Sequence, residues 1–125
     1  MPRVLYLHGF ASAPSSRKAQ YFREQLDQRG IDIEIPHLDE GNFKGLTLSG
    51  QLRVIERAAN GAPVIVIGSS MGGYLAALYA ARHPEVERVI LMAPAFNFYD
   101  RWMEMLQPEE LELWRREGEL PVFHY

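Results

Sequence analysis

The 125-residue sequence predicts an α/β fold, with about four parallel strands in the order 2-1-3-4 and helices on both faces. The first observation behind this prediction is four short apolar runs rich in β-forming residues: 3–8, 31–36, 63–68 and 86–93. The second is that segments with helical spacing separate these runs. Strands that alternate with helices form parallel sheets with right-handed crossovers, which gives a three-layer architecture.

The first strand and helix lie within residues 3–30. The run "RVLYLH" is bounded by Gly9, as expected for a buried strand, and "GFASAPSS" is a loop of small residues. Ser15 or Ser16 can cap the following helix, which we expect to end at Gly30. Its apolar positions recur at helical spacing: Ala19, Phe22 and Leu26.

The second strand is predicted by the alternating run "IDIEIP", which stops at Pro36. Residues 37–46 are a predicted loop. Thr47 can cap the next helix, and Gly61 can stop it. The inner face of that helix is apolar: Leu48, Leu52, Ile55 and Ala59.

The third strand, "PVIVIG", is almost entirely β-branched, which is typical of a central strand covered on both faces. A helix from about Gly72 to Arg82 should follow, because Pro84 prevents its continuation. Residues 86–93, "VERVILMA", form the predicted fourth strand.

The character of the chain changes after Pro94. Aromatic residues and methionine dominate "FNFYDRWMEML", and a helix should begin at Pro108, with acids in its first turn and arginines in its last. We expect a helical, cap-like segment over residues 97–125, lying on the carboxyl edge of the sheet. With the core, residues 1–96, it should make a single domain spanning 1–125.

Composition excludes several function classes. The formal net charge is −3 with acids and bases interleaved, so no basic surface for nucleic acid is expected. The chain has no cysteine, which excludes disulfides, thiolate metal sites and a cysteine nucleophile. The N-terminus lacks signal-peptide features, and no apolar run approaches the ~20 residues of a membrane span. We expect a cytoplasmic protein that binds neither nucleic acid nor membranes.

The residues that point to chemistry follow the third strand. Gly68-Ser-Ser70-Met-Gly72 matches G-x-S-x-G, in which a strand turns sharply into a helix and exposes the central serine. Gly68 and Gly72 are expected because a β-carbon there would clash with the neighbouring strand and helix. Backbone N–H groups of Phe10, in the loop after the first strand, and of Met71 could stabilise an oxyanion.

Glycine-rich turns between strand and helix also bind phosphates, so a phosphate-binding loop is the competing interpretation of this turn. "GSSMGG" does not match G-x-G-x-x-G and lacks the lysine of a P-loop. The loop after the first strand is HGFAS, which is not a glycine-rich helix start. A nucleotide-binding, flavodoxin-like domain is therefore the weaker reading.

The stretches "VLYLHGFASAPSSRKAQ" and "VIGSSMGGYLAALYAARHPE" resemble the α/β-hydrolase superfamily, and most closely small YqiA-like bacterial esterases and related acyl thioesterases. The resemblance covers residues 3 to about 96. It implies Ser70 as nucleophile, Phe10 and Met71 as oxyanion-hole donors, no metal and no cofactor. It also implies a small-molecule acyl ester or thioester substrate, cleaved through an acyl-enzyme.

In that family the catalytic acid and then the histidine follow the serine, on loops after two further strands. Ser70–Asp100–His124 has the right order, but His124 is next to the last residue. The chain therefore resembles a truncated α/β-hydrolase whose acid and base lie beyond residue 125. Of the other histidines, we expect His8 to order the oxyanion loop and His37 to lie on the surface. We expect His83 to suit the end of a helix.

Two function classes follow from these patterns. The first is a serine hydrolase with Ser70 as nucleophile, incomplete in this chain. The second is a non-catalytic, hydrolase-like binding domain, which could form a homo-oligomer through the open edge of its last strand. Activation of Ser70 distinguishes the two.

Overall fold

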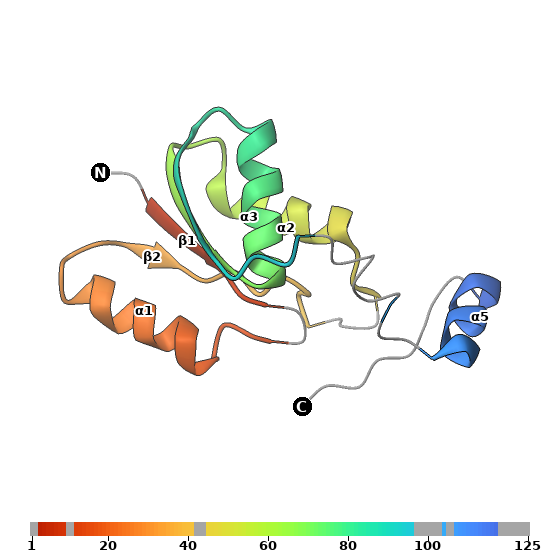
Figure 1. Ribbon diagram of the computed structural model, residues 1–125. Coiled ribbons are helices and arrows are strands. Elements are labelled where there is room, and N and C mark those ends of the chain that lie inside the picture. Colours follow the sequence, from red (N-terminus) through yellow and green to blue (C-terminus); the bar gives the residue numbers. More distant parts are fainter. Residues whose placement is uncertain (1–2, 10–11, 42–44, 97–103, 105–106, 118–125) are drawn as a thin grey trace. The chain divides into compact units, whose positions relative to one another are not determined.

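The computed structural model describes residues 3–9, 12–41, 45–96, 104 and 107–117, which belong to two compact units, 1–95 and 96–125. In the first unit, four parallel strands form one sheet in the order β2-β1-β3-β4 (Figure 1). This order and the parallel pairing confirm the predicted fold class. The strands are β1 (Arg3–Leu7), β2 (Ile33–Glu34), β3 (Val64–Ser69) and β4 (Val86–Met92).

Three helices connect these strands in sequence: α1 (Arg17–Asp27), α2 (Leu48–Ala59) and α3 (Met71–Arg82). Hydroxyl groups cap the first two, as predicted. Ser16 Oγ accepts from Ala19 N–H at 3.2 Å, and Thr47 Oγ1 accepts from Gly50 N–H at 2.9 Å. Each hydroxyl thus satisfies an amide that has no partner within its helix.

β2 is shorter than the alternating run 31–36 predicts. It pairs with β1 only through Ile33 and Glu34, opposite Val4 and Leu5. β2 is an edge strand, and Pro36 has no N–H with which to extend the ladder. The apolar pattern therefore predicted burial correctly but overestimated the length of the hydrogen-bonded strand.

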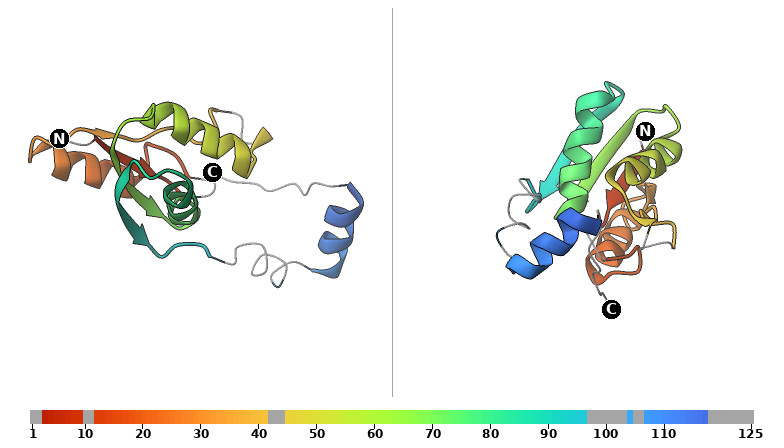
Figure 2. Two further views of the ribbon diagram at one scale, coloured as in Figure 1. Left: turned by 90° about the horizontal axis from the view of Figure 1, so that it is seen from above. Right: turned by 90° about the vertical axis from the view of Figure 1, so that its right-hand side faces the viewer.

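The helices cover both faces of the sheet, with α1 on one side and α2 and α3 on the other (Figure 2). Alternate residues of a strand point to opposite faces, so Tyr6 and Ile67 pack on the α1 side. The ring centroids of Tyr6 and Phe22 of α1 lie 5.4 Å apart. Large buried side chains fill the other side: Leu5, Leu7, Ile55, Val64, Val66, Leu75 and Tyr79.

β4 is the least covered strand. Two of its apolar residues are exposed, Ile90 (47%) and Leu91 (37%). These residues are adjacent, so their side chains point to opposite faces of the sheet. Within the described ranges, β4 pairs only with β3. Apolar surface is therefore exposed on both faces at this edge.

The second unit contains α5 (Pro108–Glu117), which begins at the predicted proline. Its first turn carries Glu109 and Glu110, and its last turn carries Arg115 and Arg116, which suits the helix dipole. Residues 97–103, 105–106 and 118–125 lie outside the described residues. That this segment covers the sheet, within one domain, stays a prediction. Among the described helices, none combines the length and apolar character needed to cross a membrane.

Candidate active site

Ser70 alone forms the turn between β3 and α3. Its backbone lies at φ 57° and ψ −119°, a conformation that costs a residue with a side chain roughly 1–3 kcal/mol. Backbone hydrogen bonds hold it there. Its N–H donates to Met92 O at 3.0 Å, and its carbonyl accepts from Gly73 N–H at 3.0 Å and from Ala95 N–H at 2.9 Å. Both α3 and the end of β4 therefore fix the turn.

The Ser70 hydroxyl is not used for helix capping, unlike the hydroxyls of Ser16 and Thr47. Ser70 occupies the N-cap position of α3, but its side chain makes no capping hydrogen bond, and the residue is exposed. Ser70 is therefore an exposed serine at the carboxyl edge of the sheet whose side chain caps no helix.

Gly68 allows α3 to approach β3 closely, and Gly72 allows α3 to approach the end of β1. A β-carbon on Gly68 would lie 2.6 Å from the carbonyl carbon of Gly72, and one on Gly72 would lie 2.6 Å from His8 O. Real β-carbons do not approach backbone atoms to such distances. These two glycines therefore lie against backbone, as the G-x-S-x-G spacing predicted.

The loop after β1 lies next to the Ser70 side chain. A β-carbon on Gly9 would lie 3.5 Å from Ser70 Cβ and 4.0 Å from Ser70 Oγ. Phe10, the residue after Gly9, lies outside the described residues. Met71 is the first residue of α3, and a helix offers no acceptor to its first N–H. The roles of Phe10 and Met71 as oxyanion donors stay predictions.

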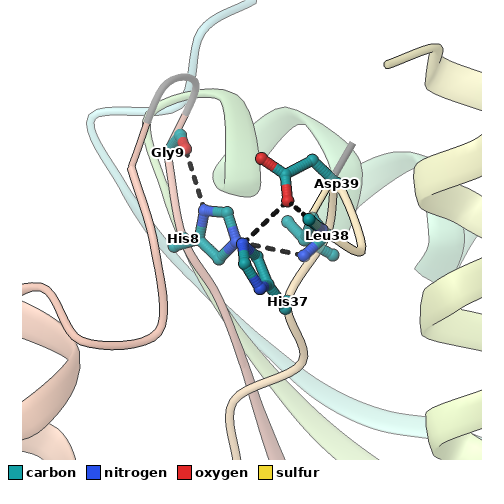
Figure 3. A network of polar contacts seen from close by, with 6 residues as sticks. His8, Gly9, His37, Leu38 and Asp39 are labelled. Atoms are coloured by element: carbon teal, nitrogen blue, oxygen red, sulfur yellow. Dashed lines mark hydrogen bonds and ion pairs between the residues drawn. The ribbon is translucent and has the colours of Figure 1, made fainter. Parts of the chain in front are cut away.

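His8 is buried at the end of β1 and is 5% exposed (Figure 3). Its Nε2 lies 3.1 Å from Leu38 N and its Nδ1 lies 2.9 Å from Gly9 O. Because the N–H of Leu38 donates, Nε2 must be the acceptor, and Nδ1 carries the proton donated to Gly9 O. Burial lowers the pKa of His8, which favours this neutral form.

His8 thus joins the loop after β1 to the loop after β2, which agrees with its predicted ordering role. Next to it, His37 Nε2 lies 2.7 Å from Asp39 Oδ1, and the rings of His8 and His37 are 6.1 Å apart edge to face (Figure 3). The His37 side chain is 48% exposed, so its predicted surface position is correct. Its pairing with Asp39 was not predicted.

A second polar group reaches the turn from the α1 side. Lys18 Nζ donates to Ser69 Oγ at 3.2 Å, and Tyr6 is buried on the same side of the sheet. Burial raises the pKa of Tyr6, so its hydroxyl stays protonated. Ser69 is 8% exposed, whereas Lys18 is exposed.

Three candidate acids and bases remain: His83, Asp100 and His124. The structure does not place any of them next to Ser70 within the described residues. His83 stacks on Tyr79, with ring centroids 3.9 Å apart, and its Nδ1 pairs with Glu85 at 3.0 Å. It follows the last residue of α3, about 18 Å along the helix from the turn, given a rise of about 1.5 Å per residue. Asp100 and His124 lie outside the described residues.

An open hollow of about 530 Å³ lies between the end of β2 and α2, away from Ser70. Its lining mixes charged and apolar side chains: Glu34, Pro36, His37, Glu40, Val54, Arg57 and Ala58. The described part of the chain contains no cluster of three or more His, Cys, Asp or Glu side chains that could bind a metal ion.

The sequence model of the uncharacterised protein family UPF0227 matches residues 3–125. The chain belongs to this family. The match covers β1, the Ser70 turn and the segment after Pro94. The predicted resemblance to YqiA-like members of the α/β-hydrolase superfamily is confirmed at the level of family and fold.

Solved structures of α/β hydrolases have the same fold as this UPF0227 chain. The mouse alpha/beta hydrolase domain-containing protein 10 aligns with a TM-score of 0.77 at 21% identity, over 98% of this chain and 53% of that chain. A protein described as a hydrolase from Agrobacterium vitis S4 gives 0.76 at 23% identity, over 98% and 57%. One assigned to the α/β superfamily, from Xanthomonas campestris pv. campestris, gives 0.63 at 28%, over 75% and 59%.

The chain therefore covers a little over half the length of these three hydrolases. Sequence reasoning missed Lys18 and Asp39, which contact Ser69 and His37. The sequence contains one indication for Lys18, because a lysine in the first turn of a helix is unfavourable for the helix dipole. It contains no indication for Asp39, which lies in a polar loop.

Proposed function

We propose that this chain is the nucleophile-bearing part of a serine hydrolase that cleaves a carboxylic ester or thioester. The observation behind the proposal is the conformation of Ser70, whose exposed hydroxyl lies at a strained turn between β3 and α3 and caps no helix. Residues other than glycine that adopt such strained backbone conformations cluster at active sites and ligand-binding sites. The family membership and the hydrolase fold support this interpretation.

In the proposed reaction, Ser70 Oγ attacks the acyl carbonyl carbon and transfers its proton to a general base. The N–H groups of Phe10 and Met71 stabilise the negative oxygen of the tetrahedral intermediate. Collapse of this intermediate breaks the bond to the leaving alcohol or thiol, which takes the proton, and leaves an acyl-serine. Water then attacks the acyl-serine and regenerates the hydroxyl.

Among the described residues, no hydrogen bond joins a histidine to Ser70. His8 Nε2 already accepts from Leu38 N–H, His37 Nε2 pairs with Asp39, and His83 lies at the far end of α3. We propose two sources for the acid and base. One is Asp100 with His124, and the other is a further segment of a longer polypeptide.

The test is intact-mass analysis after treatment with a fluorophosphonate probe. We expect one adduct on the wild-type protein, because an activated serine attacks phosphorus. We expect no adduct on Ser70→Ala and an undiminished adduct on Ser69→Ala, the matched neighbouring serine. An adduct that persists in Ser70→Ala would contradict Ser70 as nucleophile. A folded wild-type chain without adduct would contradict a complete site within these residues.

A second candidate function is a binding domain that associates with a copy of itself through β4. The observation that favours it is the exposure of Ile90 and Leu91 on opposite faces of this edge strand. An unpaired strand edge with apolar flanks is a template for strand addition. The two candidates differ in whether Ser70 reacts.

A further inference from the structure

The exposed cation Lys18 lies beside the residue that precedes the proposed nucleophile. Its Nζ is 3.2 Å from Ser69 Oγ, and Ser69 lies on the α1 side of the sheet because it is two residues after Ile67 in β3, and Ile67 packs on that side. Ser69 and Ser70 are consecutive, with Cα atoms about 3.8 Å apart. Side-chain lengths then place the Lys18 ammonium within roughly 12 Å of Ser70 Oγ, which a substrate of a few bonds can span.

The electrostatics of α1 do not explain why Lys18 is there. α1 begins with Arg17 and Lys18 and has no acid in its first turn, so two cations lie at the positive end of the helix dipole. α5 has the favourable arrangement, with glutamates in its first turn and arginines in its last. Placement of residues against a local preference points to a functional use of the site.

The described carboxylates do not neutralise Lys18. Two acids of the loop after β2 are paired with other cations, Asp39 with His37 and Glu40 with Arg57. No ion pair joins Lys18 to any carboxylate within the ranges that the structure describes. A lysine ammonium has three N–H donors, and Ser69 accepts one. Two donors therefore remain for an anion.

We infer that Lys18 binds a carboxylate carried by the substrate whose acyl carbonyl Ser70 attacks. This inference rests on the proposed function and adds to it a substrate class, anionic esters or thioesters. The Ser69 hydroxyl fixes the ammonium on the α1 side of the turn, while its other N–H groups contact the carboxylate. The carboxylate can belong to the acyl part or to the leaving group.

Two pairs of esters separate these sources. The acyl pair is 4-nitrophenyl hydrogen glutarate, an anion, and 4-nitrophenyl pentanoate, which is neutral. The leaving-group pair is 4-acetoxybenzoate and phenyl acetate. The measurement is kcat/KM for each ester with wild type, Lys18→Met, Lys18→Arg and the matched control Arg17→Met, which removes a cation from the same helical turn.

We expect Lys18→Met to lower kcat/KM about tenfold for the anionic member of one pair, as for loss of a hydrogen-bonded ion pair. The neutral partner should change less than about twofold, which excludes a purely structural effect. Lys18→Arg should retain the preference for the anion, and Arg17→Met should behave as wild type. Equal losses for both members of each pair, or none, would overturn the inference.

A binding measurement keeps the inference testable if Ser70 proves unreactive. The backbone amide NMR signals of Ser69 and Ser70 are followed during titration with pentanoate or with neutral pentanamide. We expect saturable shifts with pentanoate in wild type and Arg17→Met, but not in Lys18→Met, and none with pentanamide. Absence of pentanoate shifts in wild type would overturn the inference. Unreactive Ser70 with intact anion binding would contradict a complete catalytic site within these residues and leave the inference about Lys18 standing.

Discussion

Ser70 shows how one residue can be held in an unfavourable conformation by its neighbours. Hydrogen bonds from the end of β4 and the start of α3 fix its backbone at positive φ. Ser16 and Thr47 also precede helices, but their φ values are negative and their hydroxyls accept capping hydrogen bonds. A hydroxyl residue at the start of a helix therefore caps the helix in two cases and does not in the third, where φ is positive.

His8 is a second single residue whose state is set by its surroundings. Its lowered pKa, caused first by burial, means that the unfolded chain binds a proton more readily than the folded chain. We therefore expect the free energy of unfolding to fall as the pH drops from about 6.5 towards the lower folded pKa. Protonation would also place a second donor against Leu38 N–H.

Urea unfolding at several pH values between 7.5 and 5 measures this dependence. In His8→Gln the same interval should show a shallower decline, because the titrating group is absent while a polar side chain remains. Parallel curves for the two proteins would contradict the expected coupling between His8 protonation and folding.

At the scale of elements, the contact of β3 with α3 depends on Gly68. An alanine there would bring Cβ to 2.6 Å from Gly72 C and 2.7 Å from Gly73 Cα, both backbone atoms that cannot rotate away. We expect Gly68→Ala to lower the free energy of unfolding by about 2–3 kcal/mol, as for overpacked cores. Chemical denaturation measures the change.

Gly9→Ala is the matched control. Its nearest neighbour would be Ser70 Cβ at 3.5 Å, an ordinary contact, so stability should change by less than about 1 kcal/mol. The added methyl would nevertheless lie 4.0 Å from Ser70 Oγ and should slow labelling by a fluorophosphonate. Equal destabilisation by the two alanines would refute this steric account.

Elements were predictable from the sequence because periodicity and breakers are local signals. The alternation of strands and helices and the turn at Ser70 follow from such signals. Contacts between distant loops have no such signal. The hydrogen bond between His8 and Leu38 joins positions 30 residues apart, and that between Lys18 and Ser69 joins positions 51 apart.

At the scale of the whole molecule, the exposed apolar surface of the sheet lies at its β4 edge. β1 and β3 are flanked by strands and helices, whereas β4 exposes Ile90 and Leu91. The matched hydrolases are nearly twice as long as this chain. The edge at β4 is therefore where additional chain or a second copy would gain most from burial of apolar surface.

If the protein self-associates through β4, a charged residue introduced on this strand should prevent the association. A lysine on an edge strand opposes pairing, because its ammonium would have to be desolvated. If a second copy covers β4, the wild-type sedimentation coefficient should rise with protein concentration, and Leu91→Lys should keep that of a monomer. Leu48→Lys, at another exposed leucine (42%), should behave as wild type. A concentration-independent monomer in wild type would refute self-association and leave the hydrolase candidate.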